Sequence, residues 1–263
     1  MQTGIYYWFG FPIPNRERLK LIASAGFENV FIWWADQYAD IDGLKEMLPE
    51  LARNAGLYVE NIHTDFESAN LLWLDKPGWE DLMGGYMASI DACFRHQIPT
   101  MVVHLTKGDA PPPVNALGLD RLRRLVARAE EKNVNIALEN LQKPEYLDYV
   151  FGSVCSDKLK FCYDSGHENC YSKTGDLLDK FGDKLISLHL HDNDGTDDQH
   201  RIPGEGNIDW KTIADKLKKK NYSGSISLEV TNEFSEKTKG LSAEHFLEKA
   251  YYQANSIANL CDH

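Results

Sequence analysis

Residues 135–164 read NIALENLQKPEYLDYVFGSVCSDKLKFCYD and hold one complete structural unit. The short apolar runs Asn135–Glu139 and Lys160–Asp164 predict buried strands, and the longer stretch Pro144–Val154 between them predicts a helix. A strand that returns through a helix to a second strand forms a parallel βαβ unit. Each run also ends in a carboxylate, so the stretch predicts both a parallel sheet and polar groups at its edge.

The same alternation runs through the whole chain of 263 residues. The other six strands are expected at Ile5–Phe9, Asn29–Trp34, Tyr58–His63, Thr100–Leu105, Leu185–His191 and Ser225–Val230. The other helices are expected near Arg16–Ala25, Gly43–Ala55, Trp79–His96, Leu119–Lys132, Gly175–Phe181, Trp210–Lys219 and Ala243–Ala258. Eight strand and helix pairs of about 33 residues each account for the chain. We therefore predict an α/β fold, a single (β/α)8 TIM barrel over residues 1–263.

Composition and charge narrow the function classes. The 28 lysines and arginines stand against 40 aspartates and glutamates, a net charge of −12, which disfavours a nucleic-acid partner. No run approaches the roughly 20 apolar residues of a membrane helix, and no basic segment precedes an apolar one at the start. The five cysteines form no CxxC pair. We expect a cytoplasmic protein that does not enter a membrane.

Polar side chains close six consecutive predicted strands, where a TIM barrel places its active site. They are His63, His104, Glu139, Asp164, His189 and Glu229, and His167, Asp198 and His200 follow in the adjoining loops. Each alone could be a packing histidine or a helix cap. Together they would aim several charges into one cavity, which is costly unless a cation binds there. Imidazole and carboxylate ligands predict a divalent metal, namely Mn²⁺, Zn²⁺, Co²⁺, Fe²⁺ or Mg²⁺.

Aromatic side chains gather at the ends of the first three predicted strands or in the loops after them. They are Trp8, Phe9, Phe11, Trp33, Trp34, Phe66 and Trp73. Flat apolar rings beside a metal would suit the C–H faces of a sugar, and Phe66 and Trp73 are expected at the mouth of the site. Core packing is the alternative for at least half of these rings. Likewise, Lys107, Arg201 and Lys76 could meet a substrate phosphate or be solvated loop charges.

With these residues in place, the chain resembles the xylose-isomerase-like barrel superfamily. The motifs that carry the resemblance are Leu138-Glu139-Asn140, Asp164-Ser165-Gly166-His167, His189-Leu190-His191-Asp192-Asn193, Pro203-Gly204-Glu205-Gly206 with Ile208-Asp209-Trp210, and Leu228-Glu229. The superfamily includes sugar isomerases, sugar 3-epimerases, inosose-type dehydratases and the endonuclease IV apurinic-site nucleases.

Similarity to the epimerases implies one metal ion and a set of substrate-binding residues. The metal ligands would be Glu139, Asp164, His189 and Glu229, of which Glu139 and Glu229 would also act as acid and base. Glu145 falls at the position where the epimerases carry a substrate-binding glutamate. His167 falls at the position of their hydroxyl-binding histidine. His200 stands where the epimerases carry arginine. His189 and His191 face the same side of an extended strand, and the H-x-x-D spacing favours His189 as the ligand over His191.

Similarity to endonuclease IV implies instead a three-zinc centre. That centre would add His63, His104, His167, Asp198 and His200 as metal ligands, and Phe66 would fall where the nucleases insert an aromatic ring into DNA. The predicted loop 35–42 is acidic where the nucleases carry an intercalating arginine. Acidic groups there would repel phosphates.

The expected function is a metal-dependent sugar or sugar-phosphate isomerase or epimerase of carbohydrate metabolism. It would move protons through a metal-stabilised enediolate of a small-molecule substrate. The alternative is an endonuclease IV-like zinc phosphodiesterase that cleaves at abasic sites. An inosose-type dehydratase and a non-catalytic sugar-binding barrel are minor alternatives. The substrate, the number of metal ions and the oligomeric state stay open, although a homo-oligomer is compatible with a barrel.

Overall fold

The computed structural model describes residues 1–36 and 43–262 and shows an eight-stranded parallel barrel. The strands follow one another around the sheet in the order β7-β6-β5-β4-β3-β2-β1-β8. They are β1 (Thr3–Tyr6), β2 (Asn29–Trp33), β3 (Tyr58–His63), β4 (Thr100–Val103), β5 (Asn135–Glu139), β6 (Leu159–Asp164), β7 (Leu185–His189) and β8 (Ile226–Leu228). A parallel bridge between Leu190 and Leu228 joins the two ends of the sheet just beyond β7. The predicted TIM barrel is confirmed.

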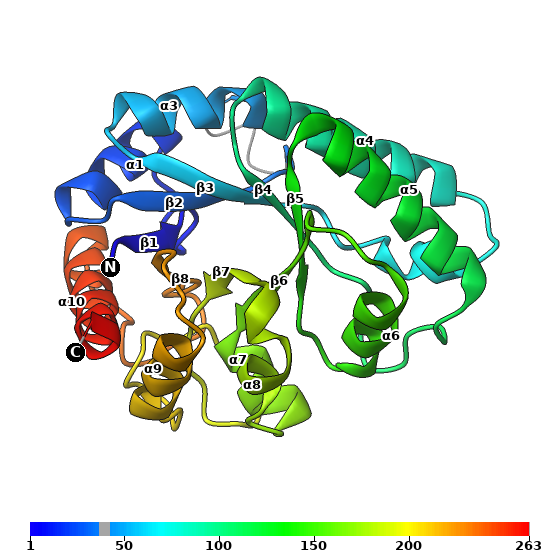
Figure 1. The fold of residues 1–263 in the computed structure, drawn as a ribbon. Coiled ribbons are helices and arrows are strands. Elements are labelled where there is room, and N and C mark those ends of the chain that lie inside the picture. Colours follow the sequence, from blue (N-terminus) through cyan, green and yellow to red (C-terminus); the bar gives the residue numbers. More distant parts are fainter. Residues whose placement is uncertain (37–42, 263) are drawn as a thin grey trace.

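Helices surround the strands on the outside of the barrel (Figure 1). They are α1 (Asn15–Ser24), α3 (Leu48–Asn54), α4 (Trp79–Arg95), α5 (Ala116–Lys132), α6 (Glu145–Ser153), α7 (Ser165–His167), α8 (Leu177–Phe181), α9 (Trp210–Lys219) and α10 (Ala243–Asp262). Shorter turns are η1 (Lys45–Met47), η2 (Ala69–Trp73), η3 (Glu168–Ser172) and η4 (Gly182–Lys184). The N-terminal ammonium meets Asp262 across 2.7 Å, so α10 brings the two ends of the described chain together.

Side chains alternate in direction along each strand, and this alternation separates the main apolar core from the side chains that lie beneath the polar groups at the strand ends. Val102, Ala137 and Cys162 form a small apolar cluster of their own. Ala137 and Cys162 lie two residues before Glu139 and Asp164, and side chains two apart in a strand point the same way. The cluster therefore lies beneath the polar groups that end these strands, while intervening side chains such as Leu138 and Phe161 join the main core.

Strand and helix ends differ from the predicted ones by a few residues. β4, β7 and β8 end before Leu105, His191 and Val230, because the chain leaves the ladder where the polar loops begin. The predicted helix Gly43–Ala55 is divided into η1 and α3, and Pro49 lies in the first turn of α3. Most of the acidic loop 35–42 lies outside the described residues. None of the described helices has the length and apolar composition to span a bilayer.

Candidate active site

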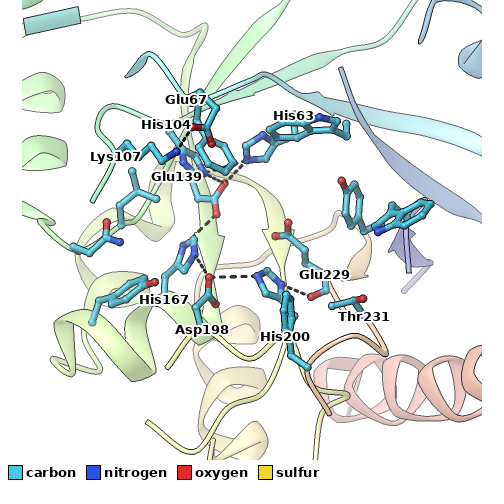
Figure 2. A pocket seen from close by; sticks show the side chains of 18 of the residues that line it. His63, Glu67, His104, Lys107, Glu139, His167, Asp198, His200, Glu229 and Thr231 are labelled. Atoms are coloured by element: carbon cyan, nitrogen blue, oxygen red, sulfur yellow. Dashed lines mark hydrogen bonds and ion pairs between the residues drawn. The ribbon is translucent and has the colours of Figure 1, made fainter. Parts of the chain in front are cut away.

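A cavity of about 550 Å³ opens at the ends of the strands and collects most of the predicted site residues. Its polar lining consists of His63, Glu67, His104, Thr106, Lys107, Glu139, Gln142, His167, Asp198, His200, Glu229, Thr231 and Glu233. Its aromatic lining consists of Tyr6, Trp8, Trp33, Phe66, Tyr171 and Phe234. In Figure 2 the labelled imidazoles and carboxylates face one another across this space. The barrel thus converts separate strand ends into one polar centre.

Glu139 stands at the middle of the centre, with its side chain only 1% exposed. Its Oε2 atom lies 3.1 Å from His63 Nε2, 3.3 Å from His104 Nε2 and 3.2 Å from His189 Nδ1. Burial alone would raise the pKa of this carboxyl, but His189 and His104 hold it well below its usual value. Burial lowers the pKa of His104. Glu139 is therefore an ionised carboxylate encircled by ring nitrogens.

The hydrogen bond of His63 determines which way its lone pair points. His63 Nδ1 lies 2.8 Å from the carbonyl oxygen of Thr64. A carbonyl oxygen only accepts, so Nδ1 carries a hydrogen, and Nε2 is the ring nitrogen that faces Glu139. His63 Nε2 and Glu139 Oε2, 3.1 Å apart, can be joined by a proton on the ring or by a cation bound between them. Metal-binding histidines are held in this way by a bond from the other nitrogen.

Three further residues place ligand atoms beside Glu139. One atom each from Glu139, Asp164, His189 and Glu229 lies within 4.8 Å of the others. His189 is fully buried, and among the described residues neither of its ring nitrogens nor Asp164 Oδ2 has a hydrogen-bond partner. Burial opposes the charged form of Glu229, yet His189 lowers its pKa to about 2. Clustered nitrogen and oxygen donors, several of them without a hydrogen-bond partner among the described residues, fit a divalent metal ion.

Asp198 is a second carboxylate, after Glu139, that lies between imidazoles (Figure 2). Its Oδ2 atom is 3.3 Å from both His167 Nε2 and His200 Nε2. Its Oδ1 atom is 3.4 Å from Nε2 of His191. Burial opposes protonation of His200, but Asp198 raises its pKa to about 10. The carboxylate therefore creates a second place that favours a positive charge.

Two segments hold these ligands in position. Asn140 Nδ2 donates to the carbonyl of Asp164 and Asn140 Oδ1 accepts from the Asp164 amide, both across 2.8 Å. The Asp164 side chain in turn accepts from the amide of His167 across 2.6 Å, which caps the short helix α7. Hydrogen bonds thus hold the segment that carries Glu139 against the segment that carries Asp164 and His167.

The structure brings Phe66 to the cavity, where its ring stacks on His104 at 4.4 Å between centroids. Trp73 and Glu145 are not among the described residues that line it. Trp73 is 2% exposed, donates to the Leu105 carbonyl across 2.7 Å and packs closely over Gly118 of α5. Glu145 begins α6 on an exposed surface. The turn η2 carries Trp73 inward, away from the mouth.

Sequence patterns did not identify some of the aromatic residues that line the cavity, nor the ion pairs that the loop residues Lys107 and Arg201 form. Tyr6 ends β1, so the rule that strand ends meet could have identified it. Tyr171 lies in the turn η3 and Phe234 in an irregular segment, where no such rule applies. Lys107 lines the cavity but pairs with Glu67. Arg201 pairs with Asp194 across 3.3 Å instead of lining the cavity.

Comparison with known proteins gives a consistent family assignment. A family model described as "Xylose isomerase-like TIM barrel" matches residues 19–249. A D-psicose 3-epimerase of Enterocloster bolteae is 30% identical over 262 residues, covering 87% of this chain and 82% of the relative. The uncharacterized protein y4fM of Sinorhizobium fredii is 36% identical, covering 81% and 80%.

Solved structures agree on the fold. The D-psicose 3-epimerase of Clostridium cellulolyticum H10, solved with D-tagatose, superposes with a TM-score of 0.78 at 16% identity. The match covers 99% of both chains. At that identity the superposition shows a shared barrel.

Proposed function

Because this chain belongs to the xylose isomerase-like TIM barrel family, we propose that it is a metal-dependent sugar isomerase or epimerase. The observation that carries the proposal is the placement of two glutamates around one buried histidine. Glu139 Oε2 and Glu229 Oε2 lie 3.2 Å and 3.1 Å from the same atom, His189 Nδ1. Two carboxylates at one centre can serve as the base and the acid of a proton transfer.

The ion would be held by Glu139, Asp164, His189 and Glu229, whose ligand atoms gather within 4.8 Å. When bound, it supplies a Lewis acid that polarises a substrate carbonyl. His63 Nε2 and His104 Nε2 lie 3.1 Å and 3.3 Å from the same Glu139 oxygen and would add two nitrogen donors beside it. Nitrogen and oxygen donors without thiolate suit Mn²⁺, Zn²⁺, Co²⁺ and Fe²⁺, and Mg²⁺ less well.

The two glutamates would carry the chemistry. One removes the proton on the carbon beside the substrate carbonyl, and the electron pair of the broken C–H bond moves into an enediolate. A proton is then returned to the opposite face of that carbon, which epimerises it, or to the neighbouring carbon, which isomerises the sugar. Free Glu229, with its pKa near 2, is a weak base. Substrate that displaces water from these buried carboxylates would raise their proton affinity.

The walls of the cavity favour an unphosphorylated sugar. Of the described residues that line it, Lys107 is the only lysine or arginine, and its ammonium already pairs with Glu67. Glu67, Glu139, Asp198, Glu229 and Glu233 add negative charge, which repels a phosphate. Rings such as Trp8, Trp33 and Phe66 offer apolar faces to C–H groups.

Histidines and an aspartate beyond the four metal ligands support the alternative of an endonuclease IV-like phosphodiesterase. His63, His104, His167, Asp198 and His200 all reach the centre, so more than one ion could be bound there. The acidic lining argues against a polyanionic duplex. Incubating the metal-loaded protein with duplex DNA that carries an abasic site tests this alternative directly, and strand cleavage would support it.

The experiment for the proposed function is a screen for proton exchange. Ketoses, aldoses and inososes, with and without phosphate, are incubated in D₂O with the protein and Mn²⁺, Zn²⁺, Co²⁺ or Mg²⁺. Deuterium should enter a carbon next to the carbonyl of at least one unphosphorylated sugar. If no sugar exchanges with any metal, the proposal is overturned.

A further inference from the structure

Arg18 is a buried arginine that no step of the proposed chemistry uses. It lies in α1, and only 1% of its surface is exposed. Its guanidinium carbon lies over the ring of Trp8, 4.5 Å from the ring centre. Trp8 lines the cavity, whereas Arg18 is not among the described residues that line it. The guanidinium therefore lies behind the indole, on the side that is turned away from the cavity.

Hydrogen bonds to the segment between β1 and α1 hold the guanidinium in one orientation. Arg18 Nη2 donates to the carbonyl oxygen of Ile13 across 2.6 Å and to that of Phe11 across 3.3 Å. Its Nη1 atom donates to Asn15 Oδ1 across 2.5 Å. A planar guanidinium can bond to several acceptors and stack on an aromatic ring at the same time, which an ammonium group cannot. Arg18 therefore fixes the chain that follows Trp8 and the Trp8 ring together.

The same segment also packs against the chain that follows Glu229. Gly10 has a positive φ of 89°, and a Cβ atom there would overlap the side chains of Thr231 and Asn232. The Asn232 amide donates to the carbonyl oxygen of Phe9 across 3.3 Å. Thr231 is itself part of the cavity lining. A change in the segment between β1 and α1 would therefore disturb two walls of the cavity.

An indole held in one orientation suits the C–H face of a sugar ring. A ring that is already ordered loses little conformational entropy when the sugar binds. The attraction between a cation and an indole is larger where both groups are desolvated, and Trp8 is 9% exposed and Arg18 1% exposed. We propose that Trp8 is the stacking platform for an unphosphorylated hexose and that Arg18 is its positioning residue. This inference rests on the proposed sugar chemistry and assigns part of the sugar affinity to one wall of the cavity.

Fluorine NMR of the full-length protein labelled with fluorotryptophan tests the positioning role without any sugar. The chain contains six tryptophans, and Trp8→Phe identifies the Trp8 resonance by its loss. Arg18→Lys keeps the charge but cannot keep both the stacking and the hydrogen bonds, so the Trp8 resonance should shift or broaden. The control Arg123→Lys, on the exposed surface of α5, should leave that resonance in place.

If Arg18→Lys does not fold, Asn15→Ala carries the same test, because it removes the acceptor of Arg18 Nη1 and should move the same resonance. A Trp8 resonance that stays unchanged in the folded variant overturns the positioning role.

Calorimetric titration of the Mn²⁺-loaded protein with D-fructose, D-psicose, D-tagatose and D-glucose tests the platform. At least one of these hexoses should bind to the wild type. Arg18→Lys should weaken its binding about three- to thirty-fold, the contribution expected of a desolvated cation–π contact. In a Trp8→Leu background the same substitution should change the dissociation constant by less than about two-fold, because Arg18 acts through the ring.

An equal loss of affinity in both backgrounds, or a wild type that binds none of these hexoses, overturns the proposal. A hexose that binds with the expected dependence on Arg18 and Trp8 but exchanges no proton supports the platform and overturns the proposed isomerase or epimerase activity. The two proposals can therefore fail separately.

Discussion

His200 donates its Nδ1 hydrogen to the backbone carbonyl oxygen of Glu229 across 2.9 Å. The same ring turns Nε2 toward Asp198 at 3.3 Å, and its backbone has a positive φ of 44°. A non-glycine residue in that conformation is strained and persists only where its surroundings hold it. The contact therefore connects the loop after β7 to the glutamate that we expect to exchange protons.

Replacing His200 by glutamine should lower kcat while leaving KM for the sugar within a few-fold. Glutamine cannot both donate to the Glu229 carbonyl and face Asp198 as a ring nitrogen does, so Glu229 loses its support. Loss of such supporting contacts at metal sites typically costs about 10–100-fold. Steady-state kinetics on the metal-loaded variant measure the split, with His245→Gln as the control. An unchanged kcat would exclude this role for His200.

Acid should destabilise the metal-free protein partly through Glu229. Burial works against its charge, but His189 lowers its pKa from 4.5 to about 2 in the folded chain. A lowered folded pKa means that the unfolded chain binds the proton more readily. The stabilisation is thus present above pH 4.5 and is lost as the pH falls toward 2. Urea unfolding measures the free energy of unfolding from pH 6 to 2, which should fall less steeply for Glu229→Gln than for wild type. Parallel pH dependences for the two proteins would contradict this prediction.

Gly118→Ala should destabilise the fold by about 1–3 kcal/mol through overpacking. The methyl group would collide with the six-membered ring of Trp73, whose indole is locked by its bond to Leu105. Gly84→Ala is the matched control, because its new methyl group meets no atom within 4 Å in α4. That control should gain about 0.4–1 kcal/mol. Chemical denaturation compares the two, and equal effects would show that Trp73 is not packed as described.

Asp192→Asn should loosen the loop that carries Asp198 and His200. The buried Asp192 carboxylate accepts from the Gly204 amide across 2.8 Å, the Ile208 amide across 3.2 Å and the Trp210 indole across 3.1 Å. The asparagine NH₂ would face one of these donors, at a cost of about 1–3 kcal/mol. Urea unfolding measures the loss, with the exposed Asp120→Asn as the control. Stability equal to that of the control would refute this anchoring role.

The sequence predicted the order of the strands and, for some strands, their exact bounds. The bounds of Tyr58–His63 and Asn135–Glu139 agree with the structure to the residue, and both carry predicted site residues at their ends. Parallel strands in a barrel end at the same face, so one rule places all these side chains together. The rule needs no knowledge of the loops.

Loop geometry was beyond the reach of local patterns. Alternation puts His189 and His191 on one face, yet the strand ends at His189 and the two rings enter different groups. Trp73 was expected at the mouth, but its partner Gly118 lies on a helix far along the chain. Long-range packing of this kind leaves no periodic signal in the sequence.

The central claim is that Glu139 and Glu229 exchange a carbon-bound proton of a sugar at a metal centre. Deuterium incorporation from D₂O into a reactive sugar should be measured by NMR for wild type, Glu139→Gln, Glu229→Gln and the exposed control Glu248→Gln, with the bound metal quantified in each. We expect exchange in the wild type and the control, and a loss of at least about 100-fold in either site variant. Near-normal exchange in Glu139→Gln or Glu229→Gln with its metal bound would contradict the account.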